Sequence, residues 1–222
     1  MLNTILLQAA NTDIKPLSIL DLAFKGGWIM LPIITLSIIA VFIFIDRYLA
    51  VKQAGKINHD LLEKIKVLIE QSKKKQALEL IAEEDSPIAR MIEKGIINMN
   101  RPLVEINTTI EMVGNLEISK LEKGLPVLAS VAGGAPMLGF LGTVIGMIQA
   151  FYDMASAGSN IDVTLLSSGI YQAMVTTAAG LTVGIIAYFA YNIMVSSIEK
   201  VVFKMEAATS DFLDLLNNKS KA

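Results

Sequence analysis

Residues 136–152 read PMLGFLGTVIGMIQAFY and contain no charged side chain. They belong to a longer uncharged run, residues 124–152, and a second run of the same kind covers residues 163–198. Each run exceeds the roughly 20 apolar residues that an α-helix needs to cross a bilayer. Soluble helices seldom stay uncharged over such a length, so both runs are predicted to be transmembrane helices.

A third apolar stretch, residues 28–45, lies near the start of the chain. Trp28 stands at its beginning, where aromatic residues anchor helices at the membrane interface, and Asp46-Arg47-Tyr48 closes its other end. Hydrophobic residues make up 53% of the 222 residues, which also favours an integral membrane protein. We therefore predict an all-α integral membrane protein with three transmembrane helices.

The charged middle segment, residues 51–123, has the pattern of soluble helices. Apolar residues recur there at helical spacing, beginning with Leu61, Leu62, Ile65, Leu68 and Ile69. Asp85-Ser86-Pro87 is a helix start signal, because a capping side chain precedes a proline at the first helical position. A further helix that opens at Arg101-Pro102 is expected to run on into the second span.

Basic residues are distributed unequally around the three spans. The middle segment and the tail after Ile198 carry most of them, whereas residues 1–27 hold only Lys15 and Lys25 and the loop at residues 153–162 holds none. The positive-inside rule then places the middle segment and the tail in the cytoplasm. The predicted topology is N-out and C-in, with a helical cytoplasmic domain.

Few residues of this chain suit enzymatic chemistry. Cysteine is absent, and the single histidine, His59, lies among charged residues where a solvated side chain is expected. Ser167 or Ser168 is a conceivable nucleophile, but no histidine or carboxylate within the spans can act as its base. We predict no catalytic residue, cofactor or metal.

The run Lys73-Lys74-Lys75 indicates a solvated helix face near anionic lipid rather than a nucleic-acid site.

Small and hydroxyl-bearing residues form strips along the second and third spans. One strip consists of Gly139, Gly142 and Gly146 with Thr143 close by, and the other consists of Ala173, Thr177, Gly180 and Gly184. Such strips let helices pack closely in lipid. Packing alone, with each threonine bonded to its own helix, and a polar pathway are both open interpretations. Pro136, inside the second span, suggests a kink or a local break.

Gln172 and Thr176 lie one row round from the strip of the third span. The amide of Gln172 needs a partner in hydrocarbon, so it should face the protein interior or a wet cavity. Neither Gln nor Thr titrates in the accessible pH range, and no Asp, Glu, His, Lys or Arg lies within the central part of any span. A proton pathway through these helices would therefore need a titrating group from another polypeptide.

The chain resembles the MotA/TolQ/ExbB proton-channel family, and most closely its ExbB branch. The resemblance rests on GGWIMLPI at residues 26–33, the Asp46-Arg47-Tyr48 exit, SPIAR at residues 86–90, LEKGLPVLASVAGGAPMLGFLGTVIGMIQAF at residues 121–151, and the third span as far as Tyr191-Asn192. Three spans with a large segment after the first also resemble ExbB and TolQ rather than the four-span flagellar stator.

The resemblance implies a homopentamer in the bacterial inner membrane, whose second and third helices line a central pore. An ExbD-like single-span partner would carry the membrane Asp in that pore, and a TonB-like protein would pass the energy to outer-membrane transporters. The family's pore threonines correspond to Thr143 and Thr177. We assign the proton pathway to Thr143, Thr177, Gln172 and Thr176, and the packing of the ring to Pro136, Gly139, Gly142, Gly146, Ala173, Gly180 and Gly184.

Two alternative functions remain open for a chain of this architecture. They are a TolQ-like stator for envelope maintenance and a passive structural or channel oligomer.

Two departures from the family pattern bear on this expectation. Many relatives carry Glu where Gln172 stands, and many carry Pro where residues 184–187 read Gly-Ile-Ile-Ala. The first departure agrees with a carboxylate that comes from the partner.

The three spans divide the chain into seven expected parts. These are a periplasmic N-terminus with a short amphipathic helix (1–27), transmembrane helix 1 (28–49), the cytoplasmic domain (50–124), transmembrane helix 2 (125–153), a periplasmic loop (154–165), transmembrane helix 3 (166–195) and a cytoplasmic C-terminal helix (196–222). The amphipathic helix is indicated by Ser18-Ile19-Leu20-Asp21, which resembles a capping box.

Overall fold

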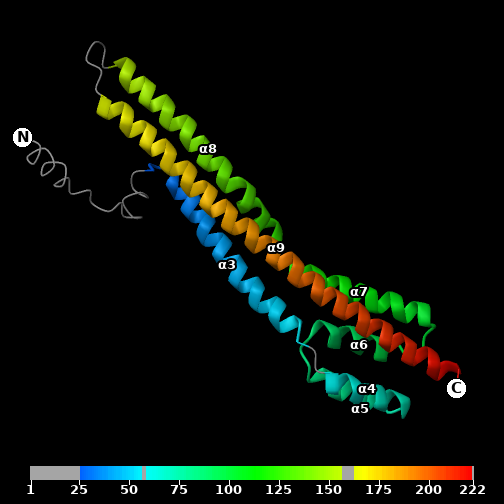
Figure 1. Cartoon of the computed structure of the whole chain (residues 1–222). Helices are drawn as coiled ribbons and strands as arrows, with labels where there is room; N and C mark the ends of the chain where they lie inside the picture. The colour runs from blue at the N-terminus through cyan, green and yellow to red at the C-terminus, as the bar shows by residue number, and fades with distance from the viewer. Residues whose placement is uncertain (1–25, 57–58, 157–162, 222) are drawn as a thin grey trace, which may run out of the picture. The chain divides into compact units, whose positions relative to one another are not determined.

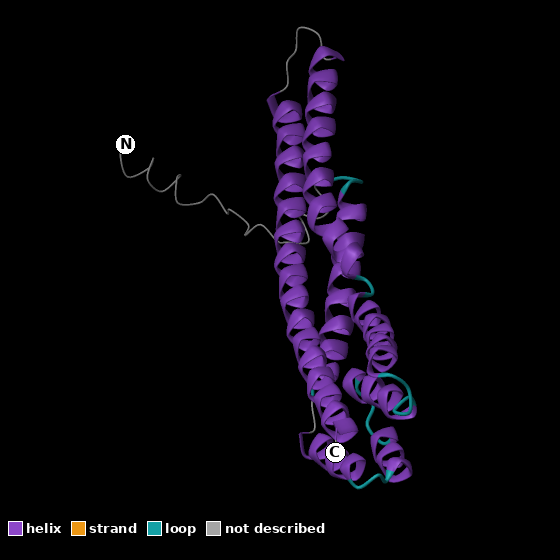
Figure 2. Cartoon of the chain, turned by 90° about the vertical axis from the view of Figure 1, so that its right-hand side faces the viewer, coloured by secondary structure: helices purple, strands orange, loops and turns teal. Residues whose placement is uncertain are grey.

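The computed structural model describes residues 26–56, 59–156 and 163–221 (Figure 1). This part of the chain consists of helices joined by loops and turns (Figure 2). The helices are α3 (Met30–Ala54), α4 (His59–Glu70), α5 (Lys74–Ala82), α6 (Pro87–Ile97), α7 (Leu103–Glu122), α8 (Leu125–Ser156) and α9 (Val163–Lys221). The predicted all-α class is confirmed. The predicted amphipathic helix near Ser18 lies outside the described residues.

Within the described residues, three stretches of helix are long and apolar enough to cross a membrane, and they lie in α3, in α7 with α8, and in α9. Their outward surfaces are apolar: Leu31, Phe42, Met137 and Phe140 are each about 70% exposed. A soluble protein would bury such side chains, whereas a bilayer or a neighbouring subunit accepts them. The chain is therefore a multi-pass membrane protein, as its charge pattern predicts.

The described residues group into two compact units, and α3, α8 and α9 each contribute to both. The first unit contains the start of α3, α8 from Gly134 onward and α9 as far as Val183. Ile29, Met30 and Ile33 are buried there, and side chains of α8 and α9 such as Leu138 and Val183 pack on them. In this unit the first turn of α3 is thus held against the two long helices.

The second unit contains α4 to α7, the end of α3, the start of α8 and the rest of α9. Its core draws on every one of these helices, from Val51 in α3 through Ile69, Ile96 and Ile110 to Met205 in α9. The amphipathic pattern predicted for residues 61–69 is confirmed, because Ile65 and Ile69 are buried and the other residues of the pattern, Leu61, Leu62 and Leu68, are partly buried.

The start of α6 follows its sequence signal. Pro87 is the first helical residue, and the Ser86 hydroxyl accepts a hydrogen bond of 3.2 Å from the Ala89 backbone N–H. A cap of this kind satisfies one of the amide groups that the first turn of a helix leaves unpaired.

One predicted continuity is wrong, because the helix that opens after Pro102 does not run unbroken into the second span. α7 ends at Glu122, Gly124 has φ +88°, and a new helix begins at Leu125. Positive φ suits glycine and interrupts a right-handed helix. Pro126 adds to the effect, since the residue before a proline is biased away from helical geometry and a proline fits the first turn of a new helix.

Pro136 does not break α8, which continues from Leu125 to Ser156 with Pro136 inside it. α9 likewise continues without interruption from Val163 to Lys221. At 1.5 Å per residue, a helix of 59 residues is longer than a hydrocarbon core of about 30 Å requires. α9 therefore extends well beyond any bilayer that it crosses.

Candidate functional site

In the first unit, α8 and α9 approach each other through glycines. A Cβ atom built on Gly180 would lie 2.5 Å from the backbone oxygen of Ala135 and 2.8 Å from the Cα of Gly139. A Cβ on Gly139 would lie 3.0 Å from the Thr176 backbone oxygen. The two backbones are therefore in direct contact, which leaves no room for a side chain at Gly180 and very little at Gly139. Close backbone contact of this kind is how small residues hold helices together in lipid.

Further along the same contact, Gly142 and Gly146 make room for residues of α9. A Cβ on Gly142 would lie 2.4 Å from the Thr176 hydroxyl oxygen, and one on Gly146 would lie 3.0 Å from the Ala173 Cβ. Sequence reasoning missed Gly169, where a Cβ would lie 2.6 Å from the Ala150 Cβ. Its position four residues before Ala173 extends the strip of small residues by one turn, which is the signal that was available.

Three of the site residues predicted from the sequence are threonines, and the structure gives each a different bond. Thr177 is half-buried, and its hydroxyl donates to the Gly139 backbone oxygen of α8 at 3.1 Å. Thr176 is only 1% exposed and donates to the Ala173 oxygen of its own helix at 2.8 Å. Thr143 is half-buried and donates to the Phe140 oxygen at 2.6 Å. The hydroxyl of Thr177 thus bridges the two helices, whereas Thr143 lies one helical turn beyond the acceptor of that bond.

Gln172 packs against the turn that precedes α3. A Cβ on Gly27 would lie 2.3 Å from the Gln172 amide nitrogen, and Gly27 has φ +69°. The backbone conformation therefore favours glycine at residue 27, and the Gln172 side chain would have to move aside for any other residue. The amide lies against protein, as expected for a polar side chain within a membrane helix.

The remaining predicted packing residues divide between the units. Pro136 is half-buried in α8, one turn before the close contact at Gly139. Gly184 is buried but belongs to the second unit, so it is not part of the α8–α9 contact of the first unit. The structure brings the other five predicted packing residues together: Gly139, Gly142, Gly146, Ala173 and Gly180.

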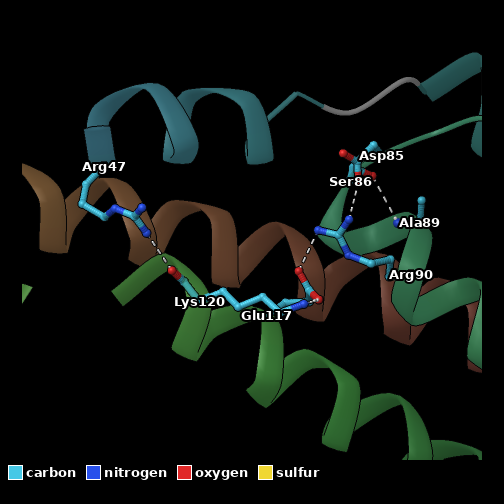
Figure 3. A network of polar contacts seen from close by, with 7 residues as sticks. All are labelled: Arg47, Asp85, Ser86, Ala89, Arg90, Glu117 and Lys120. Atoms are coloured by element: carbon cyan, nitrogen blue, oxygen red, sulfur yellow. Dashed lines mark hydrogen bonds and ion pairs between the residues drawn. The ribbon is translucent and has the colours of Figure 1, made fainter. Parts of the chain in front are cut away.

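A polar network that sequence reasoning missed lies in the second unit (Figure 3). Glu117 of α7 is buried, with only 4% of its surface exposed, and accepts hydrogen bonds from Arg90 of α6 at 2.7 Å and from Lys120 at 2.6 Å. Arg90 also pairs with Asp85, and Arg47 of α3 donates to the Lys120 backbone oxygen at 2.9 Å. The network ties α3 and α6 to the last turns of α7. The available signal was the arginine of SPIAR, although its partner cannot be read from the sequence.

The two cations decide the charge state of Glu117. Burial by itself raises the pKa of this carboxyl, but the hydrogen bonds and charges of Arg90 and Lys120 outweigh burial and hold the pKa below its ordinary value. Glu117 lies outside the uncharged segments and is ionised at neutral pH. A buried carboxylate with two cationic partners is a structural element, and its loss would leave those partners unsatisfied.

Together these features define a class of protein. It is a helical, multi-pass membrane protein in which two long helices, each with an extended uncharged run, meet through glycines and present hydroxyl and amide groups within the membrane segment. Among the described residues, no group of histidines and carboxylates could hold a metal ion.

The sequence model of the MotA/TolQ/ExbB proton channel family matches residues 83–207, and the chain belongs to this family. The matched region covers α6, α7, α8 and most of α9, including the whole glycine contact. The chain is therefore a subunit of the ExbB/TolQ type of proton channel, and the family is not one of enzymes.

Individual relatives carry names from both branches. The chain is 30% identical over 190 residues to "Putative biopolymer transport protein ExbB-like 1" of Synechocystis sp., covering 80% of this chain and 71% of that protein. It is 26% identical over 190 residues to "Putative biopolymer transport protein ExbB homolog" of Methanothermobacter thermautotrophicus, covering 85% and 67%. It is also 26% identical over 202 residues to "Tol-Pal system protein TolQ" of Pseudomonas aeruginosa, covering 86% and 87%.

Proposed function

We propose that this chain is the inner-membrane subunit of a motor driven by the proton-motive force, which works in the ExbB manner and energises TonB-dependent outer-membrane transport. One observation carries the proposal: the α8–α9 contact offers hydroxyl and amide groups, but the uncharged runs of both helices contain no Asp, Glu, His, Lys or Arg. This chain can therefore line a proton pathway without binding the proton as an acid. The acid is a membrane Asp of an ExbD-like single-span partner.

The electrical part of the driving force is about 2.3 kcal/mol per proton for each 100 mV of membrane potential. Repeated protonation and release of the partner's Asp would move the partner's helix against a ring of this subunit. Apolar side chains that α8 leaves exposed, such as Met137 and Phe140, support a ring, because neighbouring copies would cover part of this surface. The ring is a homopentamer, with N-out and C-in topology in the bacterial inner membrane.

Within the ring, Thr143 and Thr177 line the pathway. Both are half-buried in the single chain, so part of each side chain is left to face a pore. Gln172 contributes an amide at the end of the pathway near Gly27. The burial of Thr176 against Gly142 favours a packing role for this residue, which supports the neighbouring Thr177.

The substitution Thr177→Val tests the pathway. It removes the hydroxyl that bonds to Gly139 and keeps the shape, so a stability loss of only about 1 kcal/mol is expected. In a strain that lacks the native subunit, we expect the variant to assemble with its partner at normal levels but to abolish uptake that depends on the proton-motive force. Thr182→Val is the matched control, because Thr182 is exposed and bonds only to Ala178 of its own helix. Loss of assembly in Thr177→Val would favour packing alone.

A TolQ-like stator is the second candidate, and the Pseudomonas aeruginosa relative favours it because the match covers 87% of that TolQ. Deletion of the subunit distinguishes the two. An ExbB-like role predicts the loss of TonB-dependent uptake with an intact envelope, whereas a TolQ-like role predicts envelope leakage. If neither defect appears, a passive oligomer is the better account.

A further inference from the structure

An open groove runs between α7 and α9 in the second unit, where the two helices lie side by side (Figure 1). Its larger part has a volume of about 550 Å³, and a continuation of about 250 Å³ shares Val202 and Glu206 with it. The lining includes apolar side chains from both helices and from α6, namely Met91, Ile118, Val202, Met205 and Leu213. A surface of this kind accepts apolar side chains of a binding segment.

The charges along the groove all have one sign. Among the described residues, Glu111, Glu122, Glu199 and Glu206 line it, and no lysine or arginine does. All four are exposed, and within the described part of the chain none of them makes an ion pair. Other carboxylates of this unit, such as Asp85, Glu105 and Glu117, do have cationic partners. The groove therefore carries uncompensated negative charge, which attracts a basic ligand.

The position of the groove indicates where its ligand comes from. Glu122 directly precedes Lys123, which is the last charged residue before the uncharged run of α8. Glu199 is the first charged residue after the uncharged run of α9. One end of the groove is thus at the membrane boundary, and the other lies near Leu213, fourteen residues further along α9. This distance of about 21 Å matches an extended segment of about six residues. A chain that has just left the membrane would meet the groove directly.

A second copy of this chain is a poorer match for the groove. The exposed apolar stripe that it would bring is on α7, where Val104, Met112 and Leu116 are each more than 60% exposed. No lysine or arginine stands between Arg101 and Lys120 on that helix. The stripe would therefore cover the four groove glutamates without supplying cations to pair with them. Removing unpaired charges from water costs free energy, so this contact is unfavourable.

We propose that the α7–α9 groove binds the basic segment of the single-span partner that directly flanks its membrane helix on the cytoplasmic side. This inference rests on the proposed function, which supplies a single-span partner. The positive-inside rule gives the chemistry of the ligand, since the cytoplasmic flank of a single span is rich in Lys and Arg. The groove would hold the cytoplasmic end of the partner beside α7 and α9 while the partner's membrane Asp works deeper in the complex.

Photo-crosslinking in native membranes tests the proposal. p-Benzoylphenylalanine is placed at Asn115 or Ser210, which line the groove, and at Val104 as a control position outside it. The complex is irradiated, purified, and its crosslinked peptides are mapped by mass spectrometry. We expect crosslinks from both groove positions to the partner residues that flank its span on the cytoplasmic side, and none to these residues from Val104.

Charge variants make the test specific. The double substitution Glu111→Lys with Glu206→Lys should lower the crosslink yield at least fivefold, whereas Asp214→Lys, at an exposed position of α9 outside the groove, should leave it unchanged. With the native groove sequence, the yield should fall as salt is raised, because exposed charges are screened. This second measurement does not depend on the folding of a charge variant.

The possible failures differ from one another. If the partner co-purifies but the groove positions crosslink to a second copy of this chain, or only to lipid, the groove assignment is overturned while the proposed function stands. A yield that is insensitive to salt and to the double substitution also overturns it. If no single-span protein co-purifies, the proposed function fails, and this inference fails with it.

Discussion

Glu117 is a charged side chain that the protein buries, and its neighbours decide whether that burial is tolerated. Arg90 and Lys120 both donate to it, while Arg47 binds the backbone oxygen of Lys120 in the last turn of α7. The last carbonyl groups of a helix have no partner within the helix, so Arg47 satisfies one that would otherwise be left to solvent. These contacts fix the end of α7 immediately before the turn at Gly124.

We therefore expect Glu117→Gln to destabilise the second unit. The substitution leaves Arg90 and Lys120 without their anionic partner, and loss of one member of a buried pair costs about 3 kcal/mol, at the lower end of the usual range because Arg90 is partly exposed. The melting temperature of the purified protein measures this loss. Glu79→Gln, at an exposed position of α5, is the control and should change the stability little.

The pH dependence of the same variant has a defined sign. The pKa of Glu117 is lowered in the folded protein, so its stabilising contribution is complete above the ordinary carboxyl pKa of 4.5 and is lost as pH falls through the lowered value. The stability difference between the native protein and Glu117→Gln should be constant near neutral pH and should narrow only below pH 4.5. A difference that narrows between pH 8 and 6 would contradict this account.

Sequence reasoning reached some residues of the site and not others, for a physical reason. Thr177 and Gln172 stand out because polar groups in an uncharged membrane helix need partners. Glu117 does not stand out, because Glu111, Glu117 and Glu122 look alike on a charged helix. Only the packing of α7 against α6 buries one of them and leaves the other two exposed.

At the scale of elements, local signals predict helices well and predict their junctions poorly. Ser86 and Pro87 specify the start of α6 through a cap and a preset backbone angle. The break between α7 and α8 was missed, because the apolar and polar pattern continues across Lys123 and Gly124. Gly124 followed closely by Pro126 was the signal for that break, which ends one helix and starts another directly before the membrane segment.

The α8–α9 contact leads to a prediction with a matched control. Gly180→Ala places a methyl group 2.5 Å from the Ala135 backbone oxygen, and backbone atoms cannot move aside cheaply. We expect a loss of about 1–3 kcal/mol, which is the range for overpacking. Gly133→Ala is the same substitution within α8 at a position where the new methyl group meets nothing within 4 Å. There the higher helix propensity of alanine should add up to about 1 kcal/mol.

Thermal unfolding of the two variants in the same detergent compares them directly. Equal destabilisation of Gly180→Ala and Gly133→Ala would show that the glycines act through helix propensity or through neighbouring copies, and not through the α8–α9 contact within one chain.

For the molecule as a whole, the distribution of charge along the sequence was the most informative feature for predicting the class of protein. Three uncharged segments predicted a multi-pass membrane protein, and because they lack Asp, Glu, His, Lys and Arg, a proton-carrying acid has to come from another polypeptide. The two-unit organisation and the groove between α7 and α9 could not be predicted, because both depend on which helices meet. Family membership then gives the chain a role as a channel subunit, which composition alone does not.

The central claim is that this subunit forms a ring around a partner that supplies the proton-carrying acid. Native mass spectrometry of the complex, extracted gently from its own membranes, tests it most directly. The account predicts five copies of this chain together with a small single-span protein that has an Asp within its membrane segment. A bare homo-oligomer, under conditions that keep other membrane complexes whole, would contradict the motor and favour a passive scaffold.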